Sequence, residues 1–128
     1  MAQSFSLCRR AQSFRHAFRG VAHVVRSQHN AWIHAGATVA VVLGAVILQV
    51  SAFEWTVLIL AIAGVWSTEA LNTAIEAIGD ALSLERHPMI GLAKDAAAGA
   101  VLLAAIGAML VGILIFGPRV LRLLGCCT

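Results

Sequence analysis

The chain has 128 residues, of which 60% are apolar and only 12% are charged, and its formal net charge is +3. An ordinary soluble domain carries about a quarter charged residues, and a soluble fold this small could not remove so much apolar surface from water. The composition therefore excludes a soluble globular protein. It predicts an all-α integral membrane protein that forms one domain over residues 1–128.

The three cysteines predict no disulfide framework, because Cys8 lies near one terminus while Cys126 and Cys127 are adjacent at the other. We interpret all three as reduced thiols that are incidental to function. The N-terminal residues do not resemble a cleaved signal peptide, since five arginines are spread over the first 26 residues without an apolar stretch between them.

Residues 13–27 are predicted to form an amphipathic helix. Two stripes of residues recur at helical spacing. The apolar stripe contains Phe14, Phe18, Val21 and Val25, and the basic stripe beside it contains Arg15, Arg19, His23 and Arg26. Such a helix is suited to lying in the membrane interface, with its arginines near the lipid phosphates. The alternative is a helix on the soluble side that packs on the rest of the protein.

Three apolar stretches follow, and each is predicted to be a transmembrane helix: residues 31–50, 55–82 and 92–116. The first would extend about 30 Å as a helix, which matches the hydrocarbon core of a bilayer. The second would extend about 42 Å, so its far end must leave the membrane. The polar loop that follows contains Pro88, which disfavours helical conformation at His87.

Small residues recur every four positions on two of these stretches: Gly36, Ala40 and Gly44 on the first, and Ala96, Ala100, Ala104, Ala108 and Gly112 on the third. Small residues at this spacing let helices approach each other closely in a membrane. The partner of each stripe is either another helix of the same chain or a second copy of the chain.

Positive charge is distributed unevenly over the two sides that three spans would create. The five N-terminal arginines share one side with Arg86 and Lys94, whereas Arg119 and Arg122 lie on the other. Lysine and arginine favour the cytoplasmic side of a membrane. We therefore predict a multi-pass cell-membrane protein whose N-terminus and loop after the second span are cytoplasmic, so that the acidic end of this span faces the compartment that holds ATP.

One face of the second predicted span carries most of the acids: Glu69, Asn72, Glu76 and Asp80, with Thr73 beside them. Counted from Trp55, Glu69 lies about 21 Å along the helix, within the hydrocarbon core, and Glu76 lies about 31 Å along, at the interface. An ionised side chain deep in a bilayer costs about 2.5–3.5 kcal/mol. A role for this face must offset that cost.

Four interpretations of this face remain open on the residues alone: a metal or phosphate site, a proton relay, a coupling-ion site in a transporter, and structural hydrogen bonding between helices. Structural hydrogen bonding between helices accounts for Asn72 or Thr73 but poorly for three acids. A small proton-coupled transporter needs one membrane-embedded acid, which Glu69 could supply. An ATP-dependent lipid kinase needs carboxylates for Mg²⁺, a lysine such as Lys94 for the transferring phosphate, and a deeper carboxylate that takes a proton from a lipid hydroxyl.

The kinase interpretation has one difficulty. The sequence contains neither a G-x-x-x-x-G-K-[ST] loop nor a G-x-G-x-x-G loop. Helix side chains would therefore have to hold the phosphates of the nucleotide, unlike in the P-loop and protein-kinase folds.

Two segments resemble the signature of the prokaryotic diacylglycerol kinase family, which includes the undecaprenol kinases: E-A-L-N-T-A-I-E-A-I-G-D and, after the H-P loop, A-K-D-A-A-A-G-A-V-L-L. The resemblance extends over residues 14–116. It implies a homotrimer whose subunits have an N-terminal surface helix and three transmembrane helices, with active sites between subunits. It also implies Mg-ATP as phosphoryl donor and a membrane lipid as acceptor. We expect no nucleic-acid partner.

The resemblance implies roles for individual residues. Glu69 matches the proposed general base, and Glu76 matches a Mg²⁺ ligand in the nucleotide site. Lys94 and Asp95 match the pair at the third span that contacts the nucleotide. The remaining matches are two polar residues of the active site, Asn72 and Asp80, and three residues near the nucleotide, Glu85, His87 and His16.

One position departs from the family pattern. The family carries a second metal-binding glutamate before the first span, in a pattern like T-E-R-N-F-R-I-H, whereas this chain reads S-Q-H-N-A-W-I-H. Gln28 replaces that glutamate and Trp32 replaces an arginine, so the site loses a negative charge and should bind metal more weakly. Either the Gln28 amide binds the metal, or Asp80 or a water compensates, or the chain is a catalytically impaired homologue. We favour the first two because every other acid is present.

The acceptor lipid is suggested by a short pattern at the start of the first span. The N-x-x-I-H pattern of Asn30, Ile33 and His34 is more similar to the undecaprenol kinase branch of the family than to the diacylglycerol kinase branch. We therefore favour undecaprenol over diacylglycerol as the acceptor. His34 by itself is interpreted as a hydrogen-bonding residue near the interface.

Overall fold

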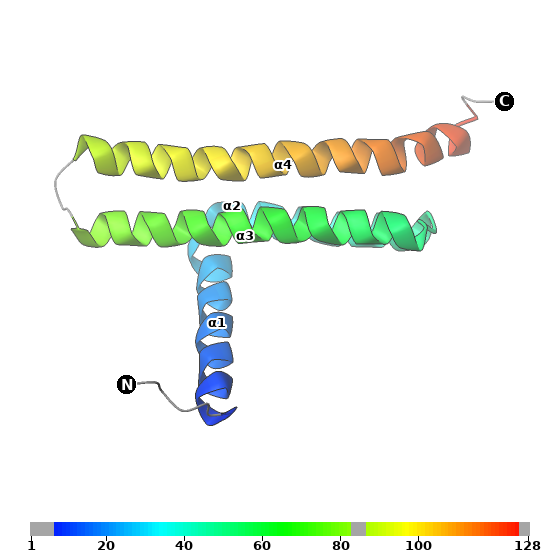
Figure 1. Cartoon of the computed structure of the whole chain (residues 1–128). Coiled ribbons are helices and arrows are strands. Elements are labelled where there is room, and N and C mark those ends of the chain that lie inside the picture. Colours follow the sequence, from blue (N-terminus) through cyan, green and yellow to red (C-terminus); the bar gives the residue numbers. More distant parts are fainter. Residues whose placement is uncertain (1–6, 83–86, 126–128) are drawn as a thin grey trace.

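The computed structural model describes residues 7–82 and 87–125. All elements within these residues are α-helices: α1 (Leu7–Ser27), α2 (His29–Ile47), α3 (Ala52–Leu82) and α4 (Pro88–Leu123). In Figure 1, α3 and α4 run side by side in opposite directions, α2 lies along α3, and α1 leaves this bundle at a steep angle. The predicted all-α class is confirmed.

Helices α2, α3 and α4 are each long and apolar enough to cross a membrane. Many of their large apolar side chains are exposed on the single chain; Phe53 and Leu114, for example, are 77% and 74% exposed. Apolar surface of this extent must be covered by lipid or by another protein surface. The structure therefore supports a multi-pass membrane protein.

Helix α4 is longer than the span of residues 92–116 predicted from the sequence. It begins at Pro88, which suits the first helical position because the N–H that proline lacks has no partner there. His87 before it is extended (φ −98°, ψ 122°), as the following proline predicts. At its other end α4 continues through Pro118 to Leu123. Next to this proline, the Arg119 guanidinium donates a hydrogen bond to the backbone carbonyl of Ile115 (2.7 Å).

The turn between α2 and α3 is fixed by hydrogen bonds at both of its ends. At the end of α2 the N–H of Val50 donates to the Ala45 carbonyl (3.1 Å), and Gln49 adopts the left-handed φ of 49°, which is the Schellman geometry. At the start of α3 the N–H of Ser51 donates to Glu54 Oε2 (2.7 Å), and the N–H of Glu54 donates to Ser51 Oγ (3.3 Å). These reciprocal bonds form a capping box.

A small apolar core holds the three membrane-length helices together next to this turn. Its buried members come from all three helices and the turn: Ala45, Val50, Leu58 and Ile115. The ring of Phe116 packs over Gly44, where an added Cβ would lie 3.7 Å from it, whereas a Cβ at Gly36 would meet no atom within 4 Å. The small-residue stripe of α2 thus has a partner within the chain at Gly44 but not at Gly36.

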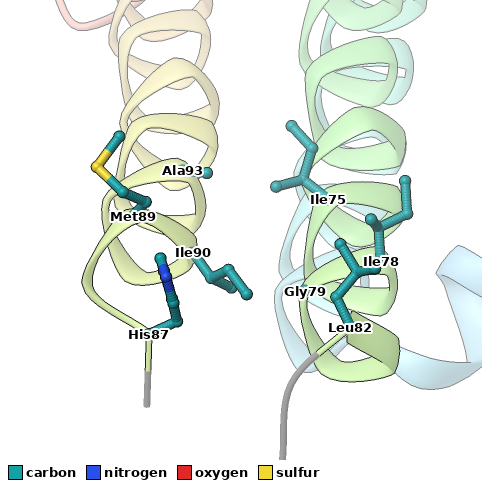
Figure 2. A pocket seen from close by; sticks show the side chains of 8 residues that line it. All are labelled: Ile75, Ile78, Gly79, Leu82, His87, Met89, Ile90 and Ala93. Atoms are coloured by element: carbon teal, nitrogen blue, oxygen red, sulfur yellow. The ribbon is translucent and has the colours of Figure 1, made fainter. Parts of the chain in front are cut away.

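Gly79 allows α3 and α4 to approach closely at the opposite end of the bundle. It is buried, and a Cβ built on it would lie 2.6 Å from Lys94 Cε and 2.9 Å from Ile90 Cγ2. Beside it a largely apolar hollow of about 300 Å³ opens between the two helices (Figure 2). The close approach of α3 and α4 at Gly79 determines where the Lys94 side chain lies.

We predict that Gly79→Ala lowers the thermal unfolding midpoint of the protein in detergent micelles. An added methyl group in a packed contact costs about 1–3 kcal/mol, and here it must displace Lys94 or Ile90. Gly91→Ala is the matched control, since a Cβ there meets no atom within 4 Å. Alanine is favoured over glycine in helices by about 0.5–1 kcal/mol, so the control should be unchanged or more stable. Equal shifts in both variants would contradict the contact at Gly79.

Candidate active site

Glu69 lies in the middle of α3 and is 1% exposed, and among the described residues it has the largest fully buried side chain. Neither of its carboxylate oxygens has a hydrogen-bond partner within the described residues. Its backbone carbonyl accepts a hydrogen bond from the buried Thr73 hydroxyl (2.9 Å), but this bond does not help the carboxylate. An unpaired buried acid is costly and typically marks a functional position.

The side chain of Glu69 lines a hollow of about 260 Å³ that α2, α3 and α4 form together. His34 of α2 lines the same hollow, and its Nε2 lies 3.8 Å from Glu69 Oε2. This distance is too long for a hydrogen bond but short enough for electrostatic attraction when the imidazole is protonated. Small α4 residues, Ala98 and Ala105 among them, leave the space in front of the carboxylate.

A second hollow of about 300 Å³ shares His34 and Ala105 with the first and extends along the helices to Phe116. Its lining is mostly apolar. Beside it Trp66 Nε1 donates to Thr38 Oγ1 (3.1 Å), and the Thr38 hydroxyl donates to the His34 backbone carbonyl (2.7 Å). These bonds connect α3 to the α2 turn that carries His34.

Glu76 lies two helical turns from Glu69, and both of its carboxylate oxygens accept hydrogen bonds. Gln28 Nε2 donates to Glu76 Oε2 (2.8 Å), and Asn72 Nδ2 donates to Glu76 Oε1 (3.1 Å). Gln28 occupies the N-cap position of α2 with extended backbone, yet its side chain makes no capping bond. The amide instead joins the junction of α1 and α2 to α3. We call Gln28, Asn72 and Glu76 the amide–carboxylate cluster.

Lys94 and Asp80 form an ion pair across α3 and α4, with 2.5 Å between Lys94 Nζ and Asp80 Oδ1. Asp80 is exposed and Lys94 is about one-third exposed, so this pair contributes little to stability. Its geometry depends on Gly79, whose missing side chain leaves the path for the lysine. The ammonium group is therefore held at the end of α3 and not in the amide–carboxylate cluster.

The remaining sequence-predicted residues are not brought together with these groups in one chain. Asp95 is exposed on α4, His16 is exposed on α1, and His87 lies at the start of α4 beside the apolar hollow of Figure 2. Glu85 lies outside the described residues. Within the parts of the chain that are described, no three His, Cys, Asp or Glu side chains are placed to hold a metal ion together.

Sequence reasoning missed two features of this site. His34 was interpreted as an interfacial hydrogen-bonding residue, but its ring faces Glu69 inside the bundle. The apolar hollow that continues from the site was not predicted at all. The approach of His34 to Glu69 could have been found by comparing how deep each residue lies in its span, because adjacent helices bring residues of equal depth together. The apolar hollow depends on the spacing of the helices, which no local sequence pattern specifies.

Three membrane-length helices around a buried acid, with further polar groups toward one end of the bundle, define a polytopic membrane protein with an internal polar site. The profile of the family described as prokaryotic diacylglycerol kinase matches residues 15–116. The chain belongs to this family, as the E-x-x-N-x-x-x-E and K-D motifs indicate.

Curated relatives carry two kinase names. The chain is 42% identical over 108 residues to the undecaprenol kinase of Bacillus subtilis (strain 168), a match that covers 84% of this chain and 88% of the relative. It is 42% identical over 113 residues to the diacylglycerol kinase of Synechocystis sp., which covers 88% of this chain and 65% of the relative. It is 41% identical over 87 residues to the diacylglycerol kinase of Escherichia coli (strain K12), a match that covers 62% of this chain and 71% of the relative.

The family and these relatives establish the class of activity. The chain is a lipid kinase, a phosphotransferase that acts on an alcohol group. This finding decides between the kinase and the transporter interpretations of the acidic face in favour of the kinase.

We predict that two acid-to-amide variants shift stability in opposite directions. Glu69→Gln removes an unpaired buried charge and should raise the thermal unfolding midpoint. Glu76→Gln replaces one acceptor oxygen by an NH2 donor, so it can accept only one of the two hydrogen bonds that Gln28 and Asn72 now donate, and the midpoint should fall. Both are measured in detergent without nucleotide or metal. A larger loss of stability in Glu69→Gln than in Glu76→Gln would contradict this account of the site.

Proposed function

We propose that this chain transfers the γ-phosphoryl group of Mg-ATP to the hydroxyl of a membrane lipid, with undecaprenol preferred to diacylglycerol. The observation that carries the proposal is the Glu69 carboxylate, which is buried in the middle of a membrane-length helix, lines a hollow and has no hydrogen-bond partner within the described residues. The undecaprenol preference is supported by the N-x-x-I-H pattern and by the similarity to the Bacillus subtilis undecaprenol kinase over most of both chains.

Glu69 is proposed to act as the general base. The lipid hydroxyl would enter the hollow beside Glu69, and its hydrocarbon chain would follow the apolar hollow toward Phe116. The carboxylate takes the hydroxyl proton as the oxygen attacks the γ-phosphorus and the bond to the β-phosphate oxygen breaks. Both oxygens of this carboxylate lack a hydrogen-bond partner within the described residues, so either can accept the hydroxyl proton.

The amide–carboxylate cluster is suited to a hard cation. Each oxygen of Glu76 accepts one hydrogen bond and so keeps a lone pair for Mg²⁺. The amide N–H of Gln28 donates a hydrogen bond to Glu76, and a rotation of that amide would offer its oxygen to the Mg²⁺ ion. Mg²⁺ usually retains waters and binds one or two carboxylates plus substrate phosphates, so Glu76 with Gln28 fits it. When bound, Mg²⁺ would neutralise charge on the transferring phosphate.

The nucleotide is proposed to bind beyond this cluster, at the end of the bundle. Lys94 would exchange part of its contact with Asp80 for a phosphate, and Asp95 beside it would contact the nucleotide. Asn72 would hold Glu76 in place through the bond described above. Three further residues are proposed near the nucleotide by family resemblance: His16, Glu85 and His87.

We further propose a homotrimer with active sites between subunits. The exposed apolar faces of the membrane-length helices support it. So does the fact that Lys94 and Asp95 form no hydrogen bond or ion pair with Glu76 within the described residues. Helix α1, with its stripes of phenylalanine and arginine, is proposed to lie on the cytoplasmic face of the membrane as an amphipathic surface helix. Its steep angle to the bundle in Figure 1 suits that placement.

The activity is tested with protein in lipid nanodiscs, Mg-ATP, and either undecaprenol or diacylglycerol. We expect phosphorylated lipid from the wild type, formed faster from undecaprenol, and a rate at least about 100-fold lower for Glu69→Gln, the usual effect of losing a general base. Thr68→Ala is the matched control, because within the described residues the Thr68 hydroxyl bonds only to backbone carbonyls of its own helix. Full activity of Glu69→Gln would contradict the base assignment, and no product from either lipid would contradict the function.

A second variant tests the metal site. Gln28→Glu would place two carboxylates where a 2.8 Å hydrogen bond now lies, an arrangement that a divalent cation stabilises. The Mg²⁺ concentration for half-maximal rate should therefore fall several-fold. Ser27→Asp adds the same charge at the neighbouring exposed position and should leave it unchanged. An unchanged Mg²⁺ requirement in Gln28→Glu would remove Gln28 from the metal site.

A further inference from the structure

A second polar region lies at the opposite end of the bundle from the amide–carboxylate cluster and takes no part in the proposed reaction. The end of α2 and the end of α4 line a hollow of about 440 Å³ there. Three residues come from each helix end: Ile47, Leu48 and Gln49, and Arg119, Arg122 and Leu123. In Figure 1 this is the end at which α4 extends to the C-terminus, away from the connection between α3 and α4.

Arg119 is held rigidly at this hollow. Its two terminal nitrogens donate to the two carboxylate oxygens of Glu54 (2.8 and 2.7 Å), and one of them also donates to the Ile115 carbonyl (2.7 Å). A guanidinium group has five N–H donors. These three bonds leave two donors for another acceptor. Glu54 is itself fixed by the Ser51 backbone and hydroxyl, so the orientation of Arg119 is set before any ligand arrives.

Arg122 follows on α4 and has a different character. Its side chain is exposed and forms no hydrogen bond or ion pair within the described residues. Glu54 balances the charge of Arg119, so the positive charge of Arg122 is left over in this region. A hydrogen-bonded guanidinium and an exposed one at the same hollow form a suitable pair for a tetrahedral oxyanion, because both offer parallel N–H donors.

Gln49 supplies a third polar group. Its φ of 49° is the left-handed conformation, which glycine adopts without strain and a glutamine does not. The Schellman turn at the end of α2 imposes this conformation through the bond from Val50 to the Ala45 carbonyl. The turn thereby places Gln49, with its amide group, among the residues that line the hollow with Arg119 and Arg122.

We propose that this hollow binds the phosphate group of an anionic membrane phospholipid. The phosphate would accept from the free donors of Arg119, from Arg122 and from Gln49, and its single negative charge would match the uncompensated arginine. The apolar part of the lining favours a lipid over a free anion. Ile47 and Leu123 are each 74% exposed, and they would lie along the acyl chains of a lipid whose headgroup occupies the hollow.

The test uses the full chain in neutral detergent, titrated with phosphatidylglycerol, phosphatidylcholine or inorganic phosphate, with thermal unfolding as the readout of binding. We expect phosphatidylglycerol to stabilise the wild type most strongly. Arg122→Gln should bind it about tenfold more weakly, since it loses a charge-assisted contact but no contact within the described residues. Arg122→Lys keeps the positive charge but loses the forked guanidinium donors, so it serves as the control for non-specific attraction and should also bind phosphatidylglycerol more weakly than the wild type.

Gln49→Gly separates ligand binding from stability. The glycine relaxes the backbone, so the variant without lipid should be at least as stable as the wild type. Its affinity for phosphatidylglycerol should nevertheless fall, which a purely structural role of Gln49 would not produce. Equal affinities of the wild type and Arg122→Gln would overturn the proposal. So would wild-type affinity in Arg122→Lys, or stabilisation by inorganic phosphate that equals the stabilisation by phosphatidylglycerol.

Discussion

The unpaired carboxylate of Glu69 is the constraint on which the rest of the structure depends. A buried acid without a hydrogen-bond partner opposes folding, so contacts elsewhere must hold the helices around it. Those contacts lie on both sides of it along α3. Toward one end is the close approach of α3 and α4 at Gly79. Toward the other are the small apolar core, the Glu54–Arg119 pair and the capped turn. Glu69 is buried because these contacts fix α2 and α4 against α3.

The length of α3 then separates the polar groups by depth. Its 31 residues extend about 47 Å, which exceeds the hydrocarbon core of about 30 Å. Glu69 remains among apolar helix faces, while Glu76 and Asp80 lie toward the end. The two substrates of a lipid kinase are separated in the same direction, because the lipid hydroxyl lies within the membrane and the nucleotide lies in the water outside it. The proposed function uses this separation, with the base beside the lipid and the metal and ammonium groups near the water.

The sequence predicted what depends on helical periodicity and on hydrophobicity. The face shared by Glu69, Asn72 and Glu76 follows from a repeat of 3.6 residues, and the three membrane-length helices follow from apolar runs. It did not predict contacts between distant segments. The bond from Gln28 to Glu76 depends on how α1 turns into α2, and the Glu54–Arg119 pair joins residues 65 positions apart. Helix α4 extends beyond the predicted span of residues 92–116 at both ends, because an apolar run marks the part of a helix that suits the membrane and not where the helix begins and ends.

The central claim is that Glu69 acts on the lipid and Glu76 acts on the metal and nucleotide. Equilibrium binding of Mg-ATP to Glu69→Gln and to Glu76→Gln, in detergent without lipid acceptor, tests this division most directly. The account predicts that Glu69→Gln binds Mg-ATP with the affinity of the wild type, while Glu76→Gln binds it at least about tenfold more weakly because a metal ligand loses its charge. Equal loss of Mg-ATP affinity in both variants would contradict the division.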